Sequence, residues 1–185
     1  GFEGEDHLED FHVHELKDSA DDDGHFDLIE TTVSHLFREP NEALNGLTYG
    51  RLLMQKLRRI GWFNPKPHIV VEVGGGLGYL ARELGKELLP FEKHSIRYCS
   101  IDITKPFLKL QLTRAKAGGW SGGGTQANAE WLPFKDNSVD LVIDNENMAD
   151  MTPVKLKKQE LHYGTGTTPQ HQEALDWIRR VRLPL

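Results

Sequence analysis

Three glycines at alternate positions, Gly74, Gly76 and Gly78, lie between a β-branched run and an apolar helical pattern. Glycines in such a loop permit a tight turn, close approach of the backbone to a ligand and close packing of the next helix. The N–H groups at the start of that helix then point at the ligand. The loop therefore predicts a site for a nucleotide-like ligand, and a plain glycine turn is the alternative.

One carboxylate follows the next predicted strand. Asp102 lies 28 residues after Gly74, close to the spacing of roughly 20 residues expected of an acid that binds ribose hydroxyls. A carboxylate suits a diol because its two oxygens accept hydrogen bonds from two hydroxyl donors. The alternative is that Asp102 only begins the turn into a helix capped by Thr104.

Strands and helices must position these residues. Short β-branched runs predict strands at residues 68–73, 96–101, 125–127 and 139–143. Helical patterns between them predict helices at residues 77–88, stopped by Pro90, and 104–117, whereas the glycine-rich segment 118–124 is predicted to be a flexible loop. Strands that alternate with helices predict a Rossmann-like α/β fold with a doubly wound parallel sheet.

Two amphipathic patterns, Phe26–Arg38 and Thr48–Ile60, precede the first strand. Helices of this length are unstable alone in water, so they need a partner surface. We expect an N-terminal helical lid over the carboxyl ends of the strands, where ligands of such sheets bind. Tyr49 and Arg51 are candidates for contacts with a substrate. The alternative is that both helices only cover a face of the sheet.

A third motif lies at residues 126–142, Q-A-N-A-E-W-L-P-F-K-D-N-S-V-D-L-V. It resembles the D-A-E-x-L-P-F-x-D-x-S-F-D-x-V segment of methyltransferases related to the ubiquinone/menaquinone C-methyltransferases. With the E-V-G-G-G-L-G loop and Ile101-Asp102, the resemblance spans residues 68–148. It implies a class I methyltransferase that transfers a methyl group from S-adenosyl-L-methionine to a small-molecule or carrier-bound acceptor.

The resemblance also implies a role for each matched residue. Glu72 matches the acid that orients the methionine amino group, and Asp102 the acid that binds the ribose. Asn128 replaces the usual aspartate that contacts the adenine amino group, and its amide oxygen can still accept that hydrogen bond. The other matched residues are the loop glycines, the apolar neighbour of the adenine and the residue whose backbone contacts the ring: Gly74, Gly75, Gly76, Gly78, Ile103 and Ala129.

The segment after the fourth strand is expected near the transferred methyl group. Asp144 and Glu146 are the candidate catalytic residues, as a general base or as ligands of a divalent metal, although no resident metal is predicted. The alternative is a loop that only closes the pocket. A short second resemblance, to the N-E-x-x-D-x-x-P-V segment of MidA-like methyltransferases, rests on Asn145, Glu146, Asp150, Pro153 and Val154.

Charge is unevenly distributed along the 185 residues. The first thirty residues hold twelve acids and one lysine, whereas the other 155 hold sixteen acids and twenty-one bases. An acidic segment repels phosphates, so no nucleic-acid partner is expected. We expect an acidic, disordered tail at residues 1–24, a lid at 25–62 and a partial cofactor-binding core at 63–185. His12 and His14 are competent metal ligands, but a solvated tail is the preferred interpretation.

The single cysteine, Cys99, excludes an internal disulfide and fits a reducing compartment. No stretch approaches the roughly 20 apolar residues of a membrane span, and no signal peptide is recognised. We therefore expect a cytoplasmic protein without membrane partners.

The last forty or so residues show a helical pattern near Glu173–Val181 but no convincing strand pattern, although a complete fold of the resembled family has seven strands. We expect the C-terminal strands to be missing and the sequence to be part of a larger multidomain protein. Two other functions remain open. One is a non-catalytic cofactor-binding or assembly module; the other is an NAD(P)-dependent oxidoreductase, for which the usual G-x-G-x-x-G has no match because position 79 is Tyr79.

Overall fold

The computed structural model describes residues 23–29, 35–63, 68–145, 147 and 155–180, apart from the side chains of Ile29, Trp177 and Arg180. The chain divides into two compact units, residues 1–151 and residues 152–185. The first unit holds every strand of the described ranges. The boundaries predicted after residues 24 and 62 remain predictions.

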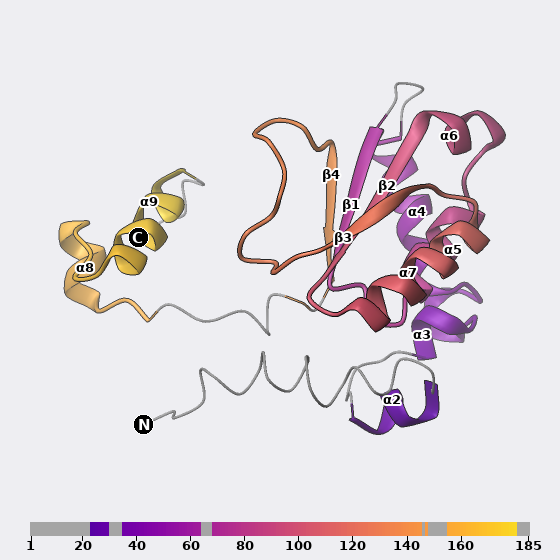
Figure 1. Ribbon diagram of the computed structural model, residues 1–185, viewed down its shortest axis with the longest axis horizontal. Coiled ribbons are helices and arrows are strands. Elements are labelled where there is room, and N and C mark those ends of the chain that lie inside the picture. Colours follow the sequence, from indigo (N-terminus) through magenta and orange to yellow (C-terminus); the bar gives the residue numbers. More distant parts are fainter. Residues whose placement is uncertain (1–22, 30–34, 64–67, 146, 148–154, 181–185) are drawn as a thin grey trace. The chain divides into compact units, whose positions relative to one another are not determined.

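Four parallel strands form the sheet of the first unit, in the order β3-β2-β1-β4 (Figure 1). They are β1 (His68–Val73), β2 (Ile96–Asp102), β3 (Ser121–Gln126) and β4 (Leu141–Asp144). β1 lies in the middle, with His68 opposite Ile96 of β2 and Val70 opposite Leu141 of β4. A parallel sheet whose strands alternate with helices is the predicted Rossmann-like α/β fold, which is thereby confirmed.

The edge strand β3 differs from the sequence prediction. Residues 121–124 were expected in a flexible loop, yet they pair with β2 from Arg97↔Ser121 to Asp102↔Gln126. The reason is that backbone pairing alone builds this strand: all its residues are exposed, and its three glycines carry no side-chain pattern. A sequence pattern based on side chains therefore cannot detect it.

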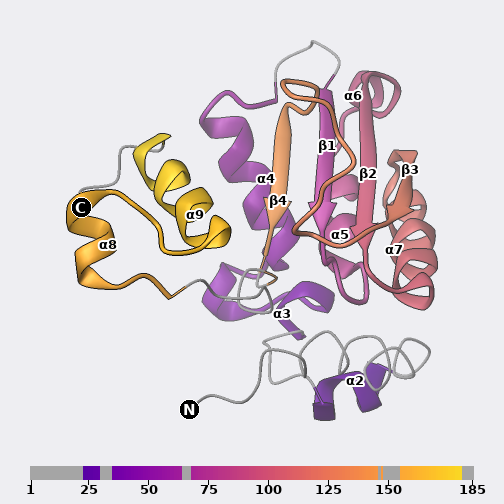
Figure 2. The same ribbon diagram turned by 60° about the vertical axis from the view of Figure 1, so that its left-hand side comes forward.

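Helices cover one face of the sheet (Figure 2). They are α4 (Tyr49–Arg59), α5 (Tyr79–Lys86), α6 (Pro90–Ser95) and α7 (Lys105–Gly118). Pro90 was expected to stop a helix but instead begins α6, where proline fits because the first turn needs no N–H donor. The core between this layer and the sheet contains Met54, Val70, Leu80, Ala81, Leu84, Leu88, Ile96, Tyr98, Ala115, Trp120 and Ile143.

Helix α4 belongs to that layer. Thr48 caps it by accepting a hydrogen bond from Arg51 N at 3.4 Å. Met54 is fully buried in the core, and Arg58 binds both carboxylate oxygens of Glu92, at 2.5 and 2.6 Å. α4 therefore covers the sheet face, which is the alternative considered for the second N-terminal helix.

The two residues of α4 that were candidates for substrate contacts, Tyr49 and Arg51, contact other parts of the domain. Tyr49 makes an edge-on contact with Phe37 of α3 (His35–Arg38), and the ring centroids lie 5.2 Å apart. Arg51 Nε donates to Glu87 Oε1 at 2.7 Å. These contacts hold α4 against its neighbours, and the short helix η3 (Glu42–Leu44) connects α3 to it.

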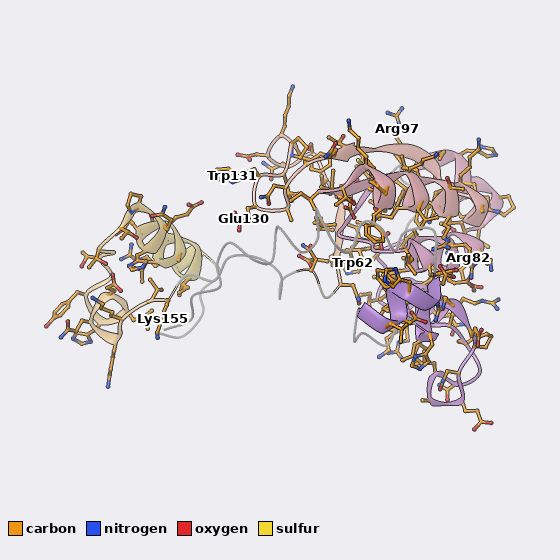
Figure 3. The ribbon with its side chains drawn as sticks, turned by 60° about the horizontal axis from the view of Figure 1, so that its bottom comes forward. Trp62, Arg82, Arg97, Glu130, Trp131 and Lys155 are labelled. Atoms are coloured by element: carbon orange, nitrogen blue, oxygen red, sulfur yellow. The ribbon has the colours of Figure 1, made fainter. Side chains whose placement is uncertain are left out.

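The opposite face of the sheet is covered by the segment between β3 and β4. Val71, Val73 and Ile101 are buried there against Ala127, Ala129, Phe134 and Val139. At the outer side of this segment Trp131 is 75% exposed, and Figure 3 shows it beside Glu130, away from the helical layer. Val142 of β4 is 51% exposed. This face is thus covered less completely than the helical face.

The second unit contains α8 (Lys158–Tyr163) and α9 (Pro169–Arg180). Glu160 joins them: its carboxylate accepts from Lys157 N at 2.7 Å, from Thr167 N at 2.9 Å and interacts with His171 Nδ1 at 2.7 Å. Together with the Thr167 hydroxyl, these donors lower the pKa of Glu160 to about 2. Over the described ranges of both units, no helix is both long and apolar enough to cross a membrane.

Candidate functional site

The carboxyl ends of the strands bring the predicted motifs together. Val73, which precedes the glycine loop, lies opposite Ile101 of β2 and Asp144 of β4. Backbone hydrogen bonds join the strand ends, from Gly74 N to the Ile101 carbonyl at 2.9 Å and from Ala127 N to the Asp102 carbonyl at 3.0 Å. Residues from four separate sequence segments therefore meet at one edge of the sheet.

The glycine loop turns directly from β1 into α5. Gly74, Gly76 and Gly78 have φ angles of 60°, 49° and 79°, a left-handed region that other residues rarely adopt. At Gly78 a Cβ would lie 2.7 Å from the Gln111 Cα, so glycine also lets α7 approach the loop. At Gly74 a Cβ would overlap the Asn147 side chain. The loop is thus packed on two sides by segments that follow it in the sequence.

Glu72 lies beneath this loop. Its side chain is 1% exposed, it accepts a hydrogen bond from the Tyr98 hydroxyl, and a Cβ on Gly75 would lie 3.0 Å from its carboxyl carbon. Burial raises the pKa of the Glu72 carboxyl to about 7; the Tyr98 hydrogen bond acts in the opposite direction, and the nearby charge of Asp102 adds to the increase. Glu72 therefore titrates near neutral pH.

Asp102 is 8% exposed and firmly held. Its Oδ1 accepts from Thr104 N at 2.8 Å and from the Thr104 hydroxyl at 3.1 Å, and its Oδ2 accepts from Gln111 Nε2 at 2.6 Å. The bonds to Thr104 are those expected of a residue that begins the turn into α7. That role is present in the structure, whereas ribose binding stays a prediction.

The residues predicted around the adenine follow β2 and β3. Ile103 is half-buried, and its carbonyl accepts from Gln126 Nε2 at 2.9 Å. Asn128 Oδ1, predicted to bind the adenine amino group, accepts from Glu130 N at 2.8 Å and so shapes the local turn. Ala129 packs against the apolar cluster of Val71, Val73 and Ile101. These residues lie at the edge of the sheet where the adenine site was predicted. Adenine binding itself stays a prediction.

The candidate catalytic residues lie at and just after the end of β4. Asp144 ends β4 and is exposed, and Glu146 lies outside the described residues. Asn147, to which the sequence analysis gave no role, presses its side chain against Gly74, and its Nδ2 is buried without a hydrogen-bond partner in the described parts of the chain. Those parts also contain no group of three His, Cys, Asp or Glu side chains that could hold a metal ion.

Helix α2 (Asp23–Ile29) lies beside the glycine loop. Phe26 is buried against Leu77 and Phe107, and its ring would be 3.5 Å from a Cβ on Gly76. Asp23, assigned by the sequence to the acidic tail, instead begins α2, where it accepts from the Tyr79 hydroxyl and pairs with Arg114 at 3.2 Å. α2, unlike α4, thus occupies a position next to the predicted cofactor site.

Fold and site together define a class of protein. A parallel sheet with β1 in the middle, a glycine loop after β1 and a buried acid at the end of β2 are the features of Rossmann-like domains that bind nucleotide-containing cofactors. The family described as "Methyltransferase domain" matches residues 71–160. That part of the chain is therefore a methyltransferase domain, which confirms the class I family resemblance and favours it over the oxidoreductase alternative. No curated protein matches the chain.

Proposed function

We propose that the chain binds S-adenosyl-L-methionine at the carboxyl ends of β1, β2 and β3 and transfers its methyl group to a small-molecule or carrier-bound acceptor. The observation that carries this proposal is the meeting of the Gly74–Gly78 loop with buried Asp102 inside a matched methyltransferase domain. The finer similarities, to ubiquinone/menaquinone-type and MidA-like enzymes, remain predictions; the first of them supplies the adenine-binding roles of Ile103, Asn128 and Ala129.

The residues at the loop fit such a ligand. Buried polar groups nearly always have a hydrogen-bond partner, and the Nδ2 of Asn147 has none among the residues that the structure describes, so it calls for one. The Asn147 side chain lies against Gly74, and its Nδ2, as a donor, suits the carboxylate of the methionine moiety. The carboxyl group of Glu72 is buried beneath Gly75. It supports the loop from below and so orients the amino group of that moiety. Asp102 accepts hydrogen bonds from the ribose, and Ile103, Asn128 and Ala129 surround the adenine.

Methyl transfer requires little further chemistry from the protein. The sulfonium of the cofactor supplies an activated methyl group, so the chain must mainly align the acceptor and exclude water. A general base is needed only where the acceptor loses a proton. Asp144 is the described candidate for that base, because it ends β4 opposite Val73, next to the glycine loop. Glu146 remains the second candidate from the sequence.

We further propose that α2 acts as the lid over the cofactor. Phe26 packs beside Gly76 at the loop, and the bonds of Asp23 to Tyr79 and Arg114 hold the helix there. With S-adenosylhomocysteine bound, residues 23–29 should gain protection from hydrogen exchange. Protection confined to residues 68–130 would show that α2 only covers the surface.

A non-catalytic cofactor-binding module is the second candidate function. It is favoured by the sheet itself, because the described residues form four strands and the predicted family fold has seven. Both candidates predict cofactor binding, so a methyl-transfer assay with candidate acceptors separates them.

Thermal unfolding in the presence of ligands tests the proposal. A ligand that binds only the folded state adds about 2.7 kcal/mol at a hundredfold excess over its Kd. S-adenosylhomocysteine should therefore raise the melting temperature, and NAD should not. A shift with NAD but none with S-adenosylhomocysteine would refute the proposed cofactor.

A further inference from the structure

A glutamine on α7 connects the two predicted cofactor-binding motifs. Gln111 is fully buried on the face of α7 that also carries Phe107 and Ala115. Its Nε2 donates to the carbonyl of Gly76 at 3.0 Å and to Asp102 Oδ2 at 2.6 Å. Its Oε1 accepts from the Ser100 hydroxyl. One side chain thus bridges the glycine loop, the acid at the end of β2 and the strand before it.

The chemistry of these partners allows only one orientation of the amide. The Gly76 carbonyl and the Asp102 carboxylate are acceptors, so they must face the NH2 group, whereas the Ser100 hydroxyl can donate to the oxygen. A hydrogen bond to a buried charged group is stronger than one between neutral groups. Gln111 therefore fixes the direction of the Asp102 carboxylate relative to the loop.

We infer that Gln111 is a positioning residue for the ribose of the cofactor, acting through Asp102 without touching the ligand. The inference rests on the proposed function, because it assumes that Asp102 binds the ribose. A preorganised acceptor loses less conformational freedom when it binds than a mobile one. Gln111 thus contributes to cofactor affinity by holding Asp102 and the loop in register before the ligand arrives.

A purely structural role would give a different result. If Gln111 only fills space and satisfies buried polar groups, its replacement lowers stability but leaves the affinity of the folded protein unchanged. If it positions Asp102, its effect on affinity depends on the presence of Asp102. A double-mutant cycle measures that dependence directly.

The test is calorimetric titration of the full chain with S-adenosylhomocysteine, comparing wild type, Gln111→Met, Asp102→Ala and the double variant. Methionine keeps the length of the side chain and removes both polar atoms. We expect Gln111→Met to weaken binding about tenfold in the wild-type background and less than about threefold beside Asp102→Ala. Gln172→Met is the matched control, because Gln172 Nε2 also donates to an aspartate, Asp176, at 3.0 Å, but in the second unit. It should leave affinity unchanged.

Each outcome decides a separate question. Equal losses in the two backgrounds, or no loss in either, would overturn the positioning role while leaving the proposed function intact. Wild type that binds no S-adenosylhomocysteine would overturn both. If Gln111→Met does not fold, Ser100→Ala serves instead, because it removes the bond that orients the amide. About threefold weaker binding is expected there, and unchanged binding would contradict the inference.

Discussion

The two halves of the predicted active site are held very differently. At the ends of β1 and β2, Glu72 and Asp102 are buried; Tyr98 of β2 donates to Glu72, and Gln111 of α7 donates to Asp102. At the end of β4, the candidate general base Asp144 is exposed. The two acids of the predicted cofactor half are thus held by neighbouring side chains, whereas the described candidate of the acceptor half is open to solvent. Substitutions that act on one half and spare the other test this contrast.

The largest effect is expected where the loop meets α7. In Gly78→Ala the new methyl group would lie 2.7 Å from the backbone of Gln111, at a φ of 79°. The strained backbone and the overlap together should lower the free energy of unfolding by about 4 kcal/mol. Gly61→Ala is the control, with φ of 80° and no atom within 4 Å of the Cβ position. It should cost about 1 kcal/mol in the same urea titration, and equal costs would contradict the predicted contact between loop and α7.

The pH dependence of the free energy of unfolding should reveal the titration of Glu72. The folded protein raises the pKa of this carboxyl from 4.5 to about 7, so it binds the proton more tightly than the unfolded chain. The resulting stabilisation is fully present below pH 4.5 and is lost as the pH rises to 7, a change of at most about 3 kcal/mol. Glu72→Gln should remove that slope from urea titrations between pH 4.5 and 7. An unchanged slope in the variant would assign it to other groups.

Asn147 offers a test of cofactor binding at the glycine loop. Asn147→Ala should weaken binding of S-adenosylhomocysteine by about 1.5 kcal/mol, the scale of a hydrogen bond to a charged group. Stability without ligand should stay the same or rise, because the variant removes a buried amide nitrogen that has no partner within the described ranges. Calorimetry and thermal unfolding of the same preparations measure the two effects. Lower stability with unchanged affinity would show that Asn147 is only a packing residue.

The smallest effect on binding is expected at Asp144. Its side chain is exposed at the end of β4, so Asp144→Asn should change the affinity for S-adenosylhomocysteine by less than about 0.5 kcal/mol. If Asp144 is the general base, kcat should nevertheless fall by a factor of about 100 or more. Unchanged kcat would remove Asp144 from the reaction and leave Glu146 as the remaining candidate.

The sequence predicted the cofactor half better than the rest for a physical reason. Glycines that need positive φ, an acid at a strand end and β-branched runs are local signals, and β1, β2 and Thr48 lie where they were expected. Strand β3 was placed only in part, because glycines 122–124 have no side-chain pattern. Gln111 and Asn147 were missed because their roles depend on contacts across 35 and 73 positions, with Gly76 and Gly74. The one signal that could have identified Gln111 is its position as a polar residue on the otherwise apolar face of α7.

The different positions of the N-terminal helices also could not be predicted from the sequence. Both patterns are amphipathic, and amphipathicity indicates only that a face is buried. The structure places α4 against α5 and the core, whereas Phe26 of α2 lies beside the glycine loop. Each placement combines a buried apolar side chain with a tertiary ion pair: Met54 and Arg58–Glu92 for α4, Phe26 and Asp23–Arg114 for α2.

The central claim is that the ends of β1 and β2 form a site for S-adenosyl-L-methionine in which Asp102 binds the ribose. Calorimetric titration of wild type and Asp102→Ala with S-adenosylhomocysteine, at neutral pH and well below both melting temperatures, tests it most directly. Because Asp102 also holds Thr104 and Gln111, the variant should be less stable, by about 1–3 kcal/mol. We predict one binding site in the wild type and a loss of about 2–3 kcal/mol of binding free energy in the folded variant. Equal affinities for the two proteins would show that Asp102 only begins α7, and would contradict the claim.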